Sequence, residues 1–303
     1  MILRGKIIKG IGGFYYVHTG EGDFECRAKG IFRNRREKPL VGDEVELSPV
    51  QNSDRERSGN LIRILRRKNQ LLRPEVSNVD QAVVLFSLRD PSPSLPLLDR
   101  FLIHMEMQEI PVRILFNKAD LLVTEEERER ALELQRIYEG ASYSVRLLSV
   151  RRADCREELL SLFRGKSSVL SGPSGVGKSS LINLIHPEAR METGELSRKI
   201  RRGKNTTRHT EFFYLDEESY VMDTPGFSSL YVSGIEAERL RYFYPEFEKF
   251  RGECRYKSCV HIGEPLRDCR VKRALSEGEI PRERYESYRQ LYREIRDQEE
   301  RHG

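Results

Sequence analysis

The chain of 303 residues is 38% hydrophobic and 33% charged, contains no tryptophan and carries a formal net charge of +5. This length suits two or three domains, and the hydrophobic content excludes a chain that is disordered throughout. The longest apolar runs stop well short of the roughly 20 residues of a membrane helix, and the N-terminus lacks the pattern of a secretory signal, so we expect a cytoplasmic protein without a membrane partner.

Residues 1–70 contain five short β-rich segments separated by Gly, Asn and Asp, which predicts a small barrel of the five-stranded OB type. Phe14, Tyr15 and Tyr16 are interleaved with basic residues, as a surface that stacks bases and contacts phosphates requires. The alternative for Phe14 and Tyr16 is that their rings fill the barrel core. The five segments are LRGKIIKGIG, GFYYVHTG, FECRAKG, DEVELSPV and NLIRILRR.

Basic residues are concentrated in two parts of the chain. Residues 1–70 hold 15 Lys and Arg against 9 Asp and Glu, a net charge of +6, and the segment SRKIRRGKNTTRH contains no acidic residue. Both clusters fit a polyanion such as nucleic acid, because neutralised phosphates supply most of the sequence-independent affinity. A solvated charged surface is the open alternative for each cluster.

From residue 71 to residue 233 the pattern changes to β-strands that alternate with helices, which predicts a largely parallel sheet covered by helices. In such sheets, ligands bind at the carboxyl ends of the strands. The expected strands are QAVVLFSL, VRILF, SVRLLSV, SSVLSG and YVMDT, and the expected helices include LLDRFLIHMEMQ and EEERERALELQRIYEG.

The segment FNKAD, at the end of the second of these strands, predicts recognition of a guanine base. The Asp120 carboxylate can accept hydrogen bonds from both N1 and N2 of guanine, whereas adenine has no matching pair of donors. Asn117 can bond the other edge of the ring, and the stem of Lys118 can cover its face. Ser149 and Val150, at the end of the next strand, fit a backbone contact to O6. An ordinary surface turn is the alternative for either segment taken alone.

The segment SVLSGPSGVGKSS matches the phosphate-loop template G-x-x-x-x-G-K-[ST] between a predicted strand and a predicted helix. Glycines let backbone N–H groups approach phosphate oxygens, and the helix that follows points its positive end at the anion. Lys178 can reach the β and γ phosphates, and Ser179 can ligate magnesium. The expected nucleotide-binding residues are Asn117, Lys118, Ala119, Asp120, Ser149, Val150, Gly172, Pro173, Ser174, Gly175, Val176, Gly177, Lys178, Ser179 and Ser180.

The segment VMDTPGF supplies residues that can respond to the γ-phosphate. Asp223 can hold magnesium through a water molecule, and the N–H of Gly226 can contact the γ-phosphate until hydrolysis releases it. Thr206 and Thr207, in the basic segment upstream, are candidates for a second hydroxyl ligand of magnesium. Phe227 stands where many GTPases carry a glutamine that orients the attacking water, so unaided hydrolysis is expected to be slow.

Residues 234–303 are rich in charge and predicted to be helical. In the last helix, Tyr285, Tyr288, Leu291, Tyr292 and Ile295 recur at steps of three or four residues, which predicts one buried face.

A Cys/His cluster precedes this helix and consists of Cys254, Cys259, His261 and Cys269. Three thiolates and one imidazole suit a single tetrahedral zinc ion with a structural role. Reduced cysteines without a metal are the alternative. An odd total of five cysteines also fits a reducing compartment better than a disulfide framework.

The order of these motifs is unusual for a GTPase. The guanine-recognition segments at 117–120 and 149–150 precede the phosphate loop at 172–179, whereas in the usual order they follow it. Together with the barrel and the Cys/His cluster, this order resembles the circularly permuted GTPases of the ribosome small-subunit-dependent GTPase A family (RsgA, YjeQ and YloQ), over essentially the whole chain.

The resemblance implies a GTP hydrolase that the small ribosomal subunit stimulates, that contacts its rRNA and that acts late in its maturation. It implies catalytic roles for Lys178, Thr207, Asp223 and Gly226, magnesium held by Ser179 and Thr207 with GTP or GDP bound, and one structural zinc ion per chain. We expect a monomer. This chain departs from the family pattern at Asn205, where a His is usual, so the residue that orients water stays open.

The expected fold is therefore a multidomain α/β protein. It comprises an OB-fold β-barrel at 1–70, a circularly permuted P-loop GTPase domain at 71–233 and a helical zinc-binding domain at 234–303.

Three alternatives remain open at this point. A Walker-type phosphotransferase would use Lys178 but would leave the guanine-recognition segment without a role. A non-enzymatic RNA-binding module would account for the barrel, the basic clusters and zinc. An RNA-binding nucleotide switch need not be tied to ribosome assembly.

Overall fold

The computed structural model describes residues 1–28, 32, 37–50, 57–72, 74–189, 211–216, 218–224, 230–232 and 234–302. The chain divides into two compact units, each made of two stretches that are far apart in the sequence. Unit 1 comprises Met1–Leu85 and Val150–Gly226, and unit 2 comprises Phe86–Ser149 and Phe227–Gly303. The division into three consecutive domains at residues 70 and 233 stays a prediction.

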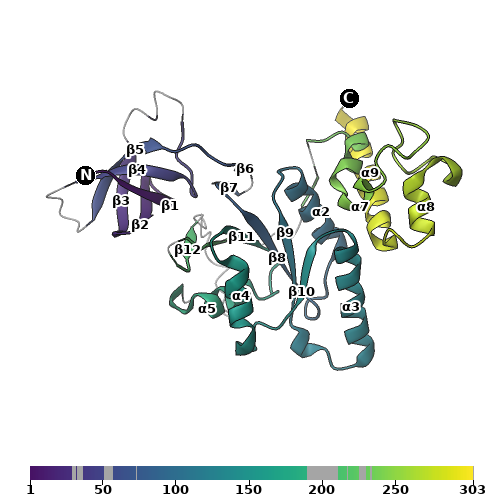
Figure 1. Ribbon diagram of the computed structural model, residues 1–303, viewed down its shortest axis with the longest axis horizontal. Helices are drawn as coiled ribbons and strands as arrows, with labels where there is room; N and C mark the ends of the chain where they lie inside the picture. Colours follow the sequence, from purple (N-terminus) through teal and green to yellow (C-terminus); the bar gives the residue numbers. More distant parts are fainter. Residues whose placement is uncertain are drawn as a thin grey trace. The chain divides into compact units, whose positions relative to one another are not determined.

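The first part of unit 1 is a closed barrel with the strand order β1-β2-β3-β5-β4 (Figure 1). Neighbouring strands are antiparallel except β3 and β5, which are parallel. The expected five-stranded barrel is confirmed, because each predicted segment contributes one strand. The strands are β1 (Leu3–Ile11), β2 (Phe14–Thr19), β3 (Gly22–Ala28), β4 (Glu44–Pro49) and β5 (Ser58–Ile64).

Phe14 and Tyr16 lie half-buried on the barrel, whose interior is filled by aliphatic side chains such as Val17 and Leu47. The Arg27 guanidinium lies 4.9 Å from the centre of the Phe14 ring. The Tyr16 hydroxyl donates to Glu25 Oε2 at 3.1 Å. The alternative that these two rings fill the barrel core is therefore wrong.

Two of the basic residues of β1 are engaged within unit 1. Lys6 Nζ donates to Ser167 Oγ at 2.7 Å, and Lys9 Nζ pairs with Glu211 Oε2 at 2.8 Å. These contacts join the barrel to the second stretch of unit 1, so Lys6 and Lys9 are not part of an open basic surface.

A six-stranded sheet follows the barrel in sequence, with the order β10-β9-β8-β11-β13-β12. Three pairs of neighbours in this sheet are parallel, namely β10 with β9, β8 with β11, and β11 with β13, whereas β12 runs antiparallel to β13 at the edge. All five expected strands are confirmed. The strands are β8 (Gln81–Ser87), β9 (Val112–Asn117), β10 (Ser144–Leu147), β11 (Ser167–Ser171), β12 (Phe212–Tyr214) and β13 (Tyr220–Asp223), and a separate two-stranded sheet pairs β6 (Gln70–Leu72) with β7 (Glu75–Ser77).

Helix α3 shows how local sequence sets the helix boundaries. Thr124 caps the helix by accepting from the backbone N–H of Glu127, whose side chain in turn accepts from the backbone N–H of Thr124. Acidic residues fill the first turn, where the helix dipole favours negative charge. The helices and short 3-10 turns between strands are α2 (Leu95–Glu106), η1 (Ala119–Leu121), α3 (Glu125–Gly140), η2 (Ala153–Cys155), α4 (Arg156–Phe163), α5 (Lys178–Ile185) and η3 (Pro187–Ala189).

The C-terminal stretch of unit 2 is helical, and α7, α8 and α9 lie together (Figure 1). Tyr285, Tyr288, Leu291 and Ile295 are buried, which confirms the predicted apolar face of the last helix. Ile103 of α2 packs into the same core. None of the helices in the described ranges has the length and apolarity needed to cross a membrane. The elements are η4 (Ala237–Phe243), α7 (Pro245–Glu248), η5 (Leu266–Asp268), α8 (Arg270–Ser276) and α9 (Arg282–His302).

A buried ion-pair network at Arg284 joins four helices of unit 2. Arg284, only 1% exposed, donates from Nε to Glu246 Oε1 at 2.8 Å and from Nη1 to Asp99 Oδ1. Tyr138 donates from its hydroxyl to the same Asp99 oxygen at 3.0 Å. Burial alone would lower the pKa of Arg284, but the two carboxylates raise it well above its ordinary value. The network therefore connects α2, α3, α7 and α9 through one permanently charged side chain.

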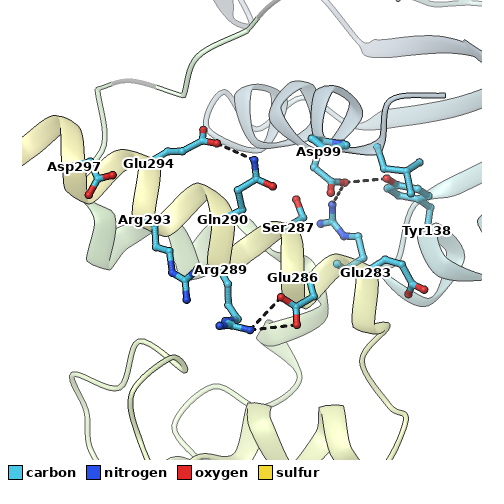
Figure 2. Close-up of a pocket in the computed structure, with 13 residues that line it drawn as sticks. Asp99, Tyr138, Glu283, Glu286, Ser287, Arg289, Gln290, Arg293, Glu294 and Asp297 are labelled. Carbon is cyan, nitrogen blue, oxygen red and sulfur yellow. Dashed lines mark hydrogen bonds and ion pairs between the residues drawn. The ribbon is translucent and has the colours of Figure 1, made fainter. Parts of the chain in front are cut away.

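Asp99 and Arg284 also line a cavity of about 480 Å³ between α2, α3 and α9 (Figure 2). Charged side chains of both signs line it. Arg289 pairs with Glu286 at 3.1 Å, and Gln290 donates to Glu294 at 2.9 Å.

Candidate nucleotide site and metal centre

The phosphate loop of unit 1 connects β11 to α5, as the sequence predicts. Gly172 has φ +151°, and a Cβ on this residue would lie 2.2 Å from the carbonyl oxygen of Leu85, so only glycine fits. Gly177 has φ +104° and immediately precedes α5, whose first residues are Lys178, Ser179 and Ser180. The turn between them consists of Pro173, Ser174, Gly175 and Val176.

Lys178 is buried and lies over this loop. Its Nζ donates to the carbonyl oxygens of Gly172 at 2.7 Å and Pro173 at 2.8 Å. The ammonium group is therefore held among the backbone groups of the loop, where it can contact a bound phosphate.

Asp223 ends β13 beside the phosphate loop, because Leu170 of β11 is its partner in the parallel register. The next residue, Thr224, bonds Ser171 Oγ at 2.6 Å and donates to the carbonyl oxygen of Leu170 at 3.0 Å. Ser171 and Thr224 stand within the segments SVLSGPSGVGKSS and VMDTPGF, but the motif patterns assign no role to either hydroxyl. Thr207 and Gly226, which we expect to contact magnesium and the γ-phosphate, lie outside the described residues.

The guanine-recognition segment lies in unit 2 at the carboxyl ends of β9 and β10, which are parallel neighbours. Asn117 ends β9 with its side chain buried, and Ala119 and Asp120 form the short turn η1. Ser149 Oγ donates to Asp120 Oδ1, which orients the carboxylate. Lys118 has φ +67°. Val150, the first residue of the second stretch of unit 1, is buried.

The Cys/His cluster forms one compact group in unit 2. The ligand atoms of Cys254, Cys259, His261 and Cys269 all lie within 4.8 Å of one another. The distance from His261 Nδ1 to the sulfur atom is 3.7 Å for Cys254, 3.2 Å for Cys259 and 3.4 Å for Cys269. These separations suit four ligands of one tetrahedral ion, so the residue set predicted from the sequence fits a structural metal.

Burial sets the protonation of these ligands. It lowers the pKa of His261 to about 4, so the imidazole is neutral and Nδ1 can bind a metal. Burial raises the pKa of the Cys259 and Cys269 thiols, so a cation is needed to hold them as thiolates at neutral pH.

Neighbouring side chains hold the loop that carries His261. Tyr285 and Tyr288 of α9 donate to the carbonyl oxygens of His261 and Val260, both at 2.6 Å. The Glu264 carboxylate accepts from the backbone N–H groups of Val260 at 2.8 Å and Ile262 at 2.9 Å. Glu264 is therefore a support of the loop, a role that the sequence alone did not reveal.

Family models match two parts of the chain. The model described as "RsgA GTPase" matches residues 64–233, and the model described as "RsgA N-terminal domain" matches residues 4–55.

Relatives match along nearly the whole chain. A protein of Agathobacter rectalis named "Small ribosomal subunit biogenesis GTPase RsgA" is 46% identical over 98% of this chain and 99% of its own length. A protein of the same name from Alkaliphilus metalliredigens is 47% identical over 97% of this chain and 98% of its own length.

Two solved structures are also similar. That of YloQ, titled "a circularly permuted GTPase", has a TM-score of 0.80 and 36% identity, covering 98% of this chain and 96% of that one. That of YjeQ from Thermotoga maritima has a TM-score of 0.81 and 34% identity, covering 97% of this chain and 99% of that one.

Proposed function

The chain belongs to the RsgA GTPase family, and from this membership we propose that it hydrolyses GTP in the biogenesis of the small ribosomal subunit. The observation that carries the proposal is the phosphate loop on β11 and α5, in a chain that aligns from end to end with GTPases of that name. The permuted order of the motifs matches the description of YloQ as a circularly permuted GTPase.

We propose that one GTP is bound by both sets of nucleotide residues. Asp120 accepts from N1 and N2 of guanine, Asn117 and Ser149 complete the contacts to the base, and residues 172–180 surround the phosphates with backbone N–H groups. The ammonium group of Lys178 is buried and lies close to the loop carbonyls. This position supports Lys178 as the cation that stabilises charge on the transferring phosphoryl group.

Magnesium and zinc have separate proposed sites. The hydroxyls of Ser179 and Thr207 hold magnesium on the phosphates, with Asp223 acting through water, and Gly226 contacts the γ-phosphate. Zinc binds to the Cys/His cluster, where four protein ligands leave no open position for a substrate, so its role is structural.

We propose that the partner is the small ribosomal subunit, with contacts to its rRNA, and that the chain acts as a monomer. The half-buried Phe14 ring beside the Arg27 guanidinium supports the barrel as one RNA-contacting surface. A cytoplasmic location follows from this partner.

Hydrolysis measured with GTP and with ATP, each with and without purified small or large ribosomal subunits, tests the function. We expect slow release of phosphate from GTP alone and a large increase only with small subunits. Equal use of ATP would support a phosphotransferase instead. Binding to RNA without hydrolysis in any mixture would support an RNA-binding module.

The variant Asp120→Asn is expected to shift the base preference from guanine to xanthine. Loss of the charged acceptor should weaken GTP binding about ten- to hundredfold, as expected for hydrogen bonds to a charged group. Xanthine has a carbonyl group at position 2, which can accept from the new amide, so xanthosine triphosphate should bind more tightly than it does to the wild type. Competition titrations with both nucleotides measure the shift.

Glu126→Gln is the matched control for this substitution, because Glu126 is an exposed carboxylate near the start of α3. It should leave both affinities unchanged. An Asp120→Asn protein that keeps its full preference for GTP would rule out Asp120 as the group that reads the base.

A further inference from the structure

The three residues that follow β8, Leu88–Asp90, bond the guanine-recognition loop, residues 117–121, at three successive points. The backbone N–H of Leu88 donates to the carbonyl oxygen of Asn117 at 2.9 Å. The carbonyl oxygen of Asp90 accepts from Lys118 Nζ. Between them, Arg89 Nη1 donates to the carbonyl oxygen of Leu121 at 3.2 Å. Residues 88–90 belong to none of the motifs that predict nucleotide binding.

Arg89 also connects the recognition loop to the start of α3. Its Nη1 lies 2.8 Å from Glu127 Oε1, while Glu127 Oε2 accepts from the backbone N–H groups of Val123 at 2.8 Å and Thr124 at 3.1 Å. One carboxylate therefore caps the helix with one oxygen and binds Arg89 with the other. These contacts, together with the guanidinium attraction, lower the pKa of Glu127 and keep it ionised.

The two ends of the loop are held by different contacts. At its beginning, the backbone N–H of Ala119 donates to the carbonyl oxygen of Leu148 at 3.1 Å, and Ser149 donates to Asp120. At its end, Leu121 is bonded by the guanidinium of Arg89. Asp120 lies between these supports, so the position of its carboxylate depends on both of them.

We propose that Arg89 is a positioning residue for guanine recognition, which places the Asp120 carboxylate by fixing the end of the 117–121 loop to the capped start of α3. The inference rests on the proposed function, because it assumes that Asp120 reads the base. In this proposal Arg89 acts through the loop and its two protein partners, Leu121 and Glu127. A guanidinium suits the task because its planar fork can donate to a carbonyl and a carboxylate in fixed directions, whereas an ammonium acts as a single point charge.

Nucleotide binding by the full-length Arg89→Met protein tests the proposal. We expect its Kd for GDP to rise about three- to tenfold, less than the loss of a charge-assisted hydrogen bond to the base itself, because Arg89 acts through the loop. Inosine diphosphate lacks the 2-amino group that Asp120 bonds, so its Kd should rise less, and the preference for GDP over inosine diphosphate should shrink. Inorganic tripolyphosphate has no base, so its Kd should not change. For hydrolysis, KM for GTP should rise with kcat unchanged.

Two further variants separate positioning from a general structural effect. Arg89→Lys keeps the attraction to Glu127 without the fork, so its Kd for GDP should fall between those of the wild type and Arg89→Met. Arg128→Met is the matched control, because Arg128 donates to the carbonyl oxygen of Val123 at 3.2 Å and pairs with Glu125 at 3.0 Å, outside the 117–121 loop. It should bind GDP as the wild type does.

Two results would overturn the proposal. One is an equal Kd for GDP in Arg89→Met and Arg128→Met. The other is a loss of tripolyphosphate affinity in Arg89→Met as large as its loss of GDP affinity, which would indicate a disturbed fold. Failure of the proposed function has a different signature, because the wild-type protein would then bind ADP as tightly as GDP.

Discussion

Removal of zinc is expected to unfold the part of unit 2 that surrounds the Cys/His cluster. Cys259 and Cys269 are buried within the core formed by η4, α7, α8 and α9, and Cys269 also caps α8 by accepting from the backbone N–H of Lys272. Zinc binding to small structural sites supplies about 10–16 kcal/mol, which becomes folding free energy when the site exists only in the folded chain. The loss of this zinc-binding free energy is larger than the remaining apolar contacts of a small helical module can offset.

Chelation followed by hydrogen exchange measures this effect. Exchange should accelerate over residues 253–276 when zinc is removed, and Cys269→Ser should reproduce the acceleration. Cys155→Ser is the control, because Cys155 is a half-exposed thiol outside the cluster, and it should leave exchange unchanged. Equal protection in protein of measured zinc content and in zinc-free protein would contradict a structural metal.

Arg284→Met is expected to lower the free energy of unfolding by about 3–5 kcal/mol, the usual result when one member of a buried ion pair is removed. The substitution leaves the carboxylates of Asp99 and Glu246 buried, with no cation between them. Methionine can fill most of the space of the arginine stem, so the loss comes mainly from the uncompensated charge. Urea denaturation of the full-length protein measures the change.

Two comparisons show whether charge is the cause. Arg296→Met, on an exposed part of the same helix, removes a surface pair with Glu300 at 3.5 Å and a long hydrogen bond to the Tyr292 hydroxyl at 3.5 Å, and it should cost less than about 1 kcal/mol. Adding Asp99→Asn and Glu246→Gln to Arg284→Met neutralises both carboxylates and should recover part of the loss. A loss in Arg284→Met no larger than that in Arg296→Met would be incompatible with a buried, charge-dependent network.

Periodic patterns explain why most secondary structure could be predicted. The range expected for α3 agrees with its observed bounds because its acidic first turn and apolar spacing are both local signals. β12 could not be found in this way, since Phe212–Tyr214 is too short to show a period. Local sequence also does not show the partners of the basic residues of β1, because Ser167 and Glu211, which bind Lys6 and Lys9, lie more than 150 residues away.

The functional residues also divide into those with a local sequence signal and those whose contacts depend on distant parts of the chain. The phosphate loop and the Cys/His cluster are compact in sequence, and the structure gives each the local geometry its motif predicts. The residues that support them carry no such signal. Arg284 in PRERY reads as a solvated arginine, and its burial depends on Asp99, 185 positions earlier. Arg89 likewise acquires its contacts only when β8 and β9 bring their ends together.

The contribution of Ile103 to the C-terminal core has a practical consequence for dissecting the protein. A fragment ending at residue 233 would leave an apolar part of α2 exposed to solvent, and Asp99 would face water without its guanidinium partner. Such a truncation creates an aggregation-prone surface. Precipitation or self-association of the fragment would then be mistaken for a property of the intact enzyme. Recombinant work on nucleotide binding is better served by point substitutions than by deletion of the tail.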